Sequence, residues 1–150
     1  LVRSRGLGDV YKRQEQEVLE ANQAFYRALE SLDMRQMDAV WWHEDWVKCF
    51  HPGWDLAVGW EEVRESWATI FRSTVQMRLA VSRPIVYVLG DVAWVSCIQH
   101  VTAAFEGGFS TAVLEATNLF VRRNGQWRIV HHHTTPIPDR APAGTSQVVQ

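Results

Sequence analysis

Three consecutive histidines, His131, His132 and His133, are the side chains in this sequence best suited to proton chemistry. An imidazole has an unperturbed pKa of about 6.5, so it accepts or donates a proton near neutral pH. Successive side chains on a strand point to opposite faces, which puts His131 and His133 together and His132 on the other side. If the shared face lines a pocket, His131 and His133 could orient a substrate or shuttle a proton.

His51 is the second candidate, in a predicted turn that continues with Pro52 and Gly53. Beside His131 and His133 it would complete a three-histidine metal site of the kind that binds zinc. We favour the alternative, internal hydrogen bonding, so no metal ion and no other cofactor is expected. For His51 alone, the alternative to a catalytic role is a turn residue bonded to the backbone.

Eight tryptophans give the chain an unusual aromatic content. Trp67 and Trp94 fit apolar stripes, and Trp54 follows the His51 turn, where it could act as a lid. An aromatic wall of this kind would suit a flat, apolar small molecule, although ordinary core filling is the alternative for most of these rings. Asp55 could supply a carboxylate at the pocket mouth or be a solvated turn residue.

The composition excludes several classes of protein. A chain of 150 residues with 47% hydrophobic and 21% charged residues fits one folded domain and not a disordered chain. The net charge of -2 lacks the basic excess of nucleic-acid binders, and no apolar run reaches the roughly 20 residues of a membrane helix. Two cysteines are too few for a disulfide framework, and a cytoplasmic location is expected.

Helices are predicted in the first half of the chain and strands in the second. Apolar residues recur at helical spacing over residues 15–32, Asp33 can cap a second short helix, and a third follows Gly59. A small hairpin is expected between the second and third helices. Runs rich in β-branched and aromatic residues then predict long strands at about 76–89, 91–105, 110–123 and 126–135. The turn Asn124-Gly125 favours a hairpin, so the fold class is α+β with an antiparallel meander.

The two ends of the chain differ from this domain. Within residues 1–14, the hexapeptide from Asp9 to Gln14 resembles the translated transposon end used as an adapter in sequencing libraries. We therefore interpret residues 1–14 as a disordered scar on a metagenomic gene fragment, with a short basic arm as the alternative. Residues 15–138 form the predicted domain, and residues 139–150 a flexible tail.

Three stretches carry a family resemblance: Phe25 to Asp33, Val47 to Trp67, and Thr117 to Thr134. They resemble the SnoaL-like branch of the NTF2-like superfamily, which includes ketosteroid isomerase and scytalone dehydratase. The resemblance implies a cone-shaped half-barrel, with three helices on a strongly curved antiparallel sheet, a pocket between the layers, and a homodimer through the sheet. It says less about activity, because one fold hosts many functions.

The resemblance also implies site residues. His51 takes the place of the aspartate base in the Asp-Pro pair of ketosteroid isomerase, and burial against aromatic rings would lower its pKa. Tyr26 lies one residue from the expected tyrosine position, which Phe25 occupies. Asn118 falls near the position of the isomerase acid, where it could donate a hydrogen bond but is not an acid. Ketosteroid isomerisation is therefore not expected.

Two functions follow from these predictions. The first is a cofactor-independent acid–base enzyme for an apolar or polycyclic compound, with His51 as base and His131 or His133 beside it. The second is a non-catalytic ligand-binding or dimerisation module of the same fold. An open cavity lined by these histidines would favour the enzyme, and a filled cavity would favour the module.

Overall fold

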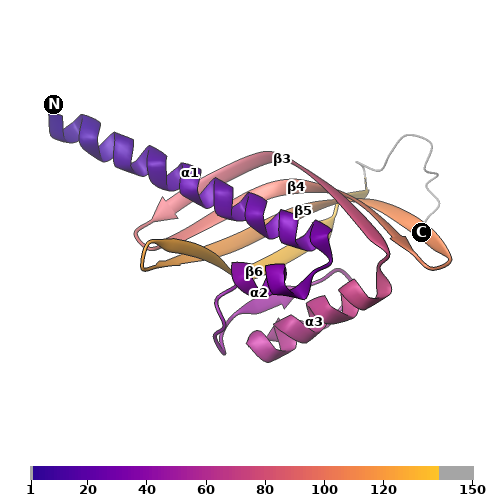
Figure 1. Ribbon diagram of the computed structural model, residues 1–150. Helices are drawn as coiled ribbons and strands as arrows, with labels where there is room; N and C mark the ends of the chain where they lie inside the picture. The colour runs from indigo at the N-terminus through magenta and orange to yellow at the C-terminus, as the bar shows by residue number, and fades with distance from the viewer. Residues whose placement is uncertain (1, 139–150) are drawn as a thin grey trace.

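Within residues 2–138, which this computed structural model describes, three helices lie against a six-stranded sheet (Figure 1). The helices are α1 (Val2–Ser31), α2 (Met34–Val40) and α3 (Trp60–Ser73). Helix α2 begins where predicted, because the Asp33 carboxylate accepts the backbone N–H of Arg35 at 2.9 Å and satisfies a free amide of the first turn. No helix in these residues is both long enough and apolar enough to cross a membrane.

Helix α1 begins earlier than the sequence predicts. The composition of residues 1–14 predicts disorder, yet the helix starts at Val2. This segment contains no proline, and each residue added to an existing helix forms one further hydrogen bond, so the helix extends into it. Tyr11 Oη accepts the backbone N–H of Val88 at 3.4 Å. The adapter origin stays a prediction, and the predicted tail at 139–150 lies outside the described residues.

The sheet has the strand order β2-β1-β6-β5-β4-β3. Its strands are β1 (Lys48–Phe50), β2 (Ala57–Val58), β3 (Gln76–Leu89), β4 (Val92–Phe105), β5 (Gly108–Arg123) and β6 (Gln126–Pro136). The predicted antiparallel meander is confirmed for β3 to β6. The sheet as a whole is mixed, because β1 pairs with β6 in parallel, and the chain between them supplies the long connection that a parallel pair needs.

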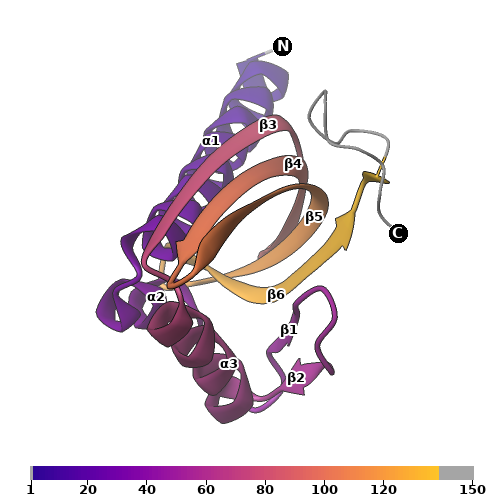
Figure 2. The ribbon, with the colours of Figure 1, turned by 90° about the vertical axis from the view of Figure 1, so that its right-hand side faces the viewer.

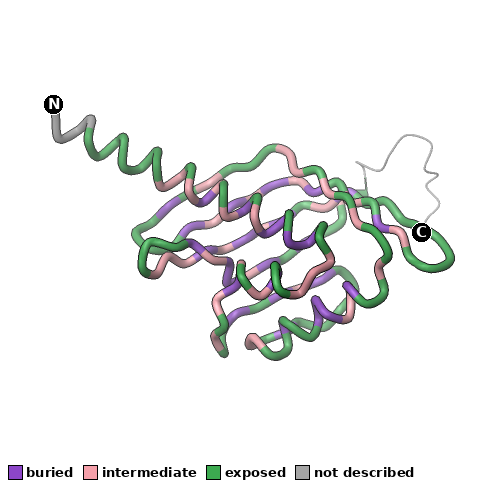
Figure 3. Tube along the Cα trace, viewed as in Figure 1, coloured by how far each residue is buried: buried purple, intermediate pink, exposed green. Residues whose placement is uncertain are grey.

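The sheet curls but does not close within the described residues, since its edge strands β2 and β3 do not pair with each other. Figure 2 shows the long strands bending across the molecule, with α1 running beside β3 and α3 below the sheet. Buried and more exposed residues alternate along β4, which places one of its faces in the core (Figure 3). The predicted α+β cone-shaped half-barrel is therefore confirmed.

Large side chains fill the space between the helices and the concave face of the sheet. The Phe25 ring meets the rings of Trp41 and Trp67 edge-on, with centroids 6.3 and 5.8 Å apart. The other large, fully buried side chains include Met37, Val18, Val47, Val63, Val95, Phe120 and Ile129. This interior is a packed aromatic core in which the tryptophans act mainly as filling.

One extra residue in β6 changes which side chains face this core. Phe120 of β5 pairs with Ile129, but the preceding residue, Leu119, pairs with His131, so Val130 is a β-bulge. Trp127 and Ile129 are buried before the bulge, and His132 and Thr134 are buried after it. The bulge therefore reverses the alternation of the strand and turns His132 inward.

Candidate functional site

A row of polar side chains crosses the concave face at the centre of the sheet. Asn118 on β5 pairs in register with His132 on β6, which pairs with Cys49 on β1. His132 Nδ1 donates to Asn118 Oδ1 at 2.6 Å, and both side chains are buried. An amide oxygen can only accept a hydrogen bond, so His132 must carry its proton on Nδ1.

Helix α1 completes this polar row. The Asn118 amide nitrogen donates to Asn22 Oδ1 at 2.8 Å and to Tyr26 Oη at 3.1 Å. The Tyr26 hydroxyl in turn donates to Gln99 Oε1 at 2.6 Å. Tyr26 therefore belongs to this row, whereas the neighbouring Phe25 packs against the His132 ring with the centroids 4.9 Å apart. These bonds form one chain of donors from His132 through Asn118 and Tyr26 to Gln99, which we call the polar chain.

His51 lies beside the polar chain but has its own partners. His51 Nε2 is 2.9 Å from Ser66 Oγ and 3.5 Å from Cys49 Sγ. The Ser66 hydroxyl donates its hydrogen to the Val63 carbonyl at 2.7 Å, so its oxygen accepts from His51 Nε2. The basic nitrogen that remains on His51 is Nδ1.

Burial keeps both inner histidines neutral. Burial lowers the pKa of His51 to about 4, which is the direction expected for an imidazole packed against aromatic rings. Burial also lowers the pKa of His132 well below its ordinary value, and the neighbouring His51 adds to this effect. The Trp67 ring packs against both, with its centroid 4.5 Å from that of His51 and 5.7 Å from that of His132.

The polar chain is poorly suited to proton transfer. Asn118 occupies its centre, and an amide donates from nitrogen and accepts on oxygen without titrating at ordinary pH. A proton that leaves His132 therefore has no group at Asn118 that would pass it to Tyr26. Burial raises the pKa of Tyr26 far above its ordinary value, so the phenol stays protonated. The arrangement holds hydrogen bonds in place and gives specificity to the core.

The other predicted site residues do not join this cluster. His131 pairs in register with Leu119, and Leu119 with Trp94, so all three lie on the outer, convex face. His133 also lies there, with its ring 4.9 Å from Phe50. The expected cavity wall of His51 with His131 or His133 is not formed, and Trp94 stacks on Tyr87 at 5.2 Å instead of lining a cavity.

The predicted pocket mouth is a surface turn. Trp54 is 40% exposed, and its ring lies 5.2 Å from that of His51, which it partly covers. Asp55 is exposed in the same turn. Among the described residues, no group of three or more side chains is placed to bind a metal ion. The three-histidine arrangement fails because His51 faces the core while His131 and His133 face outward.

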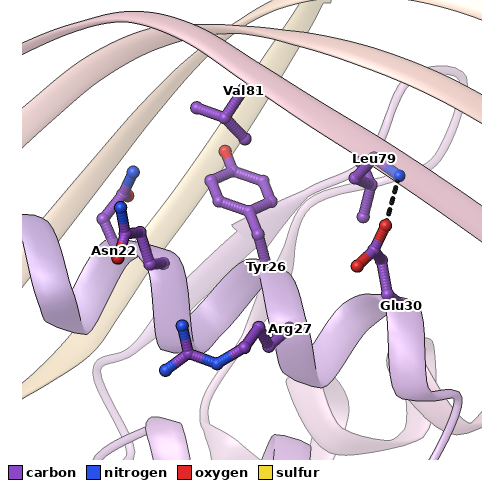
Figure 4. A pocket seen from close by; sticks show the side chains of 7 residues that line it. Asn22, Tyr26, Arg27, Glu30, Leu79 and Val81 are labelled. Atoms are coloured by element: carbon purple, nitrogen blue, oxygen red, sulfur yellow. Dashed lines mark hydrogen bonds between the residues drawn. The ribbon is translucent and has the colours of Figure 1, made fainter.

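A groove reaches the polar chain from the side. It lies between α1 and β3, has a volume of about 270 Å³, and is lined by Asn22, Gln23, Tyr26, Arg27, Glu30, Leu79 and Val81 (Figure 4). Tyr26 is the predicted ligand-binding residue that contributes to it. The site therefore combines a buried polar chain with an opening beside helix α1.

Sequence patterns contain a signal for some members of the polar chain that were not predicted. Asn22 precedes Tyr26 by four residues, which puts both on one face of a helix. Gln99 follows Val95 and Cys97 at a spacing of two, so it shares their buried face. His132 carries no such signal, because its orientation depends on the bulge at Val130.

Comparison with known proteins places this geometry in a family. Residues 18–139 match the SnoaL-like domain. The chain belongs to the SnoaL-like family. Among solved structures, this SnoaL-like domain is similar to a candidate dehydratase of the NTF2-like family from Streptomyces avermitilis. The two are 29% identical with a TM-score of 0.77, over 81% of this chain and 95% of that one.

Two further relatives come from different functional contexts. A candidate calcium/calmodulin-dependent protein kinase type II association domain from Thiobacillus denitrificans is 30% identical, with a TM-score of 0.69, over 78% of this chain and 92% of that one. F-box protein SKIP8 from Arabidopsis thaliana is 29% identical over 118 residues. That match covers 79% of the SnoaL-like domain's chain but 48% of SKIP8, so the chain spans about half the length of this relative.

Proposed function

We propose that this SnoaL-like domain is a non-catalytic association module that forms a homodimer through the outer face of its sheet. The observation that carries the proposal is an apolar row on that face, formed by Tyr87, Trp94 and Leu119 in register. The helices pack on the opposite side, so no helix covers this row within the described residues, where Trp94 and Leu119 are half-buried and Tyr87 is exposed.

The outer face is more apolar than an isolated surface needs to be. Tyr87 is 51% exposed and Leu89 66% exposed, and Ile85 and Val92 are also large, exposed and apolar on the neighbouring positions. Contiguous apolar patches on monomers rarely exceed a few hundred Å², and larger ones mark contact sites. A twofold axis would pair the same patch on both copies, which is the commonest symmetry of soluble oligomers.

The interior supports a module over an enzyme. Asn118 bonds to His132, Tyr26 and Asn22, and the Tyr26 hydroxyl donates to Gln99. These bonds occupy the Asn118 amide and the Tyr26 hydroxyl, which acid–base chemistry would need as free partners for a substrate beside His51. Large aromatic side chains fill the space that a polycyclic compound would occupy.

The relatives give this proposal two parallels. One solved neighbour, at 30% identity, is a candidate association domain of a kinase. SKIP8 is about twice as long as the matched segment, which fits a domain that serves as one module in a larger protein. The kinase neighbour and the length of SKIP8 therefore support a role as an association module.

Sedimentation of the purified chain tests the proposal. The wild type should sediment at micromolar concentration as twice the chain mass of 17.3 kDa. Trp94→Glu places a charge in the centre of the apolar row and should give a monomer, because desolvating an unpaired carboxylate opposes association. Trp54→Glu, at an exposed tryptophan in the β1–β2 turn, is the matched control and should remain a dimer. A wild type that is monomeric would refute the proposal.

Acid–base catalysis is the second candidate function, and the Streptomyces avermitilis relative at 29% identity favours it. His51 would be the base in that case, through Nδ1. The distinguishing measurement is turnover of hydroxylated polycyclic compounds by the wild type and by His51→Ala. Turnover that disappears in His51→Ala, while the variant stays folded, would overturn the non-catalytic proposal.

A further inference from the structure

The groove between α1 and β3 is separate from the outer face that the association proposal uses. Two of its lining side chains, Asn22 and Tyr26, are buried at its floor, with 2% and 5% of their surface exposed. Both belong to the polar chain, so the groove opens directly onto fixed polar groups. A cavity with few, well-positioned polar groups and apolar walls is the usual form of a small-molecule site.

The Asn22 side chain presents a donor at this floor. Its oxygen is taken by the Asn118 amide at 2.8 Å. Its amide nitrogen carries two N–H groups, and the Cys97 thiol beside it is a weak acceptor for at most one of them. Among the described residues, this nitrogen donates to no oxygen acceptor, so at least one of its N–H groups is available to a ligand in the groove.

The charged residues of the groove lie at its two ends. Arg27 is exposed and forms no ion pair among the described residues, and its side chain extends along α1 toward the Asn22 end in Figure 4. Glu30 lies at the other end, where Oε2 accepts the backbone N–H of Leu79 at 2.7 Å. This bond caps the free edge of β3 and holds the carboxylate away from Arg27. One end of the groove is therefore positive and rich in donors.

Apart from Gln23, the remaining lining residues are apolar. Leu79 and Val81 of β3 face α1 across the groove, and the Tyr26 ring rises from the helix toward Val81, while Leu79 lies above Glu30 (Figure 4). A volume of about 270 Å³ limits the occupant to a compact molecule. The shape and charge together call for an anionic head at the Asn22 end and a flat apolar body over Tyr26 and Val81.

We infer that the α1–β3 groove binds a small organic monocarboxylate of about the size of benzoate. Its carboxylate accepts from the Arg27 guanidinium and the Asn22 amide, and its ring packs on Tyr26, Leu79 and Val81. This function is additional to dimerisation and does not depend on it, because the groove lies on the helix side of β3.

Titration of isotope-labelled protein with sodium benzoate, followed by amide chemical shifts, tests the inference. We expect saturable shifts at residues on α1 and β3 around the groove. Arg27→Gln should weaken binding about tenfold, the scale of one charge-assisted hydrogen bond. Arg78→Gln is the matched control, since Arg78 is an exposed β3 arginine beside Leu79 but on the opposite face, and it should leave the affinity unchanged.

Two further comparisons make the result decisive. Benzamide has the same shape as benzoate but no charge. It should bind the wild type more weakly than benzoate does, whereas the two compounds should bind Arg27→Gln with equal affinity. Val81→Phe fills the groove and should abolish binding of both compounds. Equal weakening by Arg27→Gln and Arg78→Gln, shifts centred elsewhere, or no saturable shift would each overturn the inference. Sedimentation of the same samples reports the association state separately, so the two proposals fail independently.

Discussion

The two faces of strand β6 both carry histidines, but the histidines on the two faces have different surroundings. His132 faces the core, donates to Asn118 and is held neutral by burial. His131 and His133, its immediate neighbours, lie on the outer face, where their rings are 6.5 Å apart. On the inner face the imidazole of His132 is a buried hydrogen-bond donor with a fixed partner. On the outer face the imidazoles of His131 and His133 lie at the surface of the sheet.

This contrast shows that burial and partners decide what a histidine does. An inner imidazole can be protonated only at the cost of burying a charge in the core, and burial lowers the pKa of the half-buried His131 in the same direction. A cluster of histidines in a sequence is therefore weak evidence for a shared site. The predictions below test how far the two faces differ, from the largest effect to the smallest.

Asn118→Ala should produce the largest loss of stability. Asn118 serves His132, Tyr26 and Asn22, and its removal leaves their polar atoms buried without partners. At about 1–3 kcal/mol for each unsatisfied group, we expect a loss of about 4 kcal/mol in the free energy of unfolding. Urea denaturation at pH 7 measures it.

The neighbouring residue gives the control for this prediction. Thr117 precedes Asn118 on β5 and is half-buried on the outer face. Thr117→Ala should cost less than about 1 kcal/mol, since no buried group depends on it. Similar losses for Thr117→Ala and Asn118→Ala would contradict the distinction between the two faces.

The stability of the protein should fall as the pH drops below 6.5. Above this pH, His51 is neutral in both the folded and the unfolded chain and adds no pH dependence. Below it, the unfolded chain binds a proton that the folded state excludes until about pH 4, the pKa of folded His51. The expected loss from His51 between these pH values is about 3 kcal/mol, and His132 acts in the same direction.

A neutral replacement isolates the contribution of His51. His51→Gln keeps a polar side chain beside Ser66 but does not titrate in this range. The difference in unfolding free energy between wild type and His51→Gln should therefore shrink as the pH falls from 6.5 to 4. A difference that stays constant over this window would show that the folded state protonates His51 freely, as an exposed residue would.

The sequence predicted the elements well because local signals mark their limits. The carboxylate of Asp33 starts α2, and Asn124, with a φ of 50°, and Gly125, with a φ of 77°, form the turn between β5 and β6. The helix cap and the turn each depend on one or two neighbouring residues, so both can be recognised from the sequence. The start of α1 was predicted wrongly, since composition alone does not show where an existing helix stops propagating.

The face of each histidine could not be predicted, because it depends on one bulged residue. Counting by twos from Trp127 and Ile129, which are buried, puts His131 and His133 in the core. Val130 adds one residue to the strand and reverses that count. Nothing in the sequence around Val130 marks the bulge, since valine is common at regular strand positions.

The polar chain was predicted in part. The family resemblance led to Asn118 and Tyr26, but it gave Phe25 the expected tyrosine position, one residue from Tyr26. Both aromatic residues are in fact buried, and only the tyrosine hydroxyl requires a partner in the core. The α1–β3 groove could not be predicted, because it depends on the distance between a helix and an edge strand that lie far apart in the sequence.

The smallest effect is expected on the outer face, at His133. His133 is exposed, and Phe50 is its aromatic neighbour at 4.9 Å. His133→Ala should change the free energy of unfolding by about 0.5 kcal/mol or less at pH 7, as exposed substitutions usually do. Urea denaturation at pH 7 measures this change. A loss comparable to that of Asn118→Ala would contradict the distinction between the two faces, because His133 would then be packed as tightly as the buried side chains.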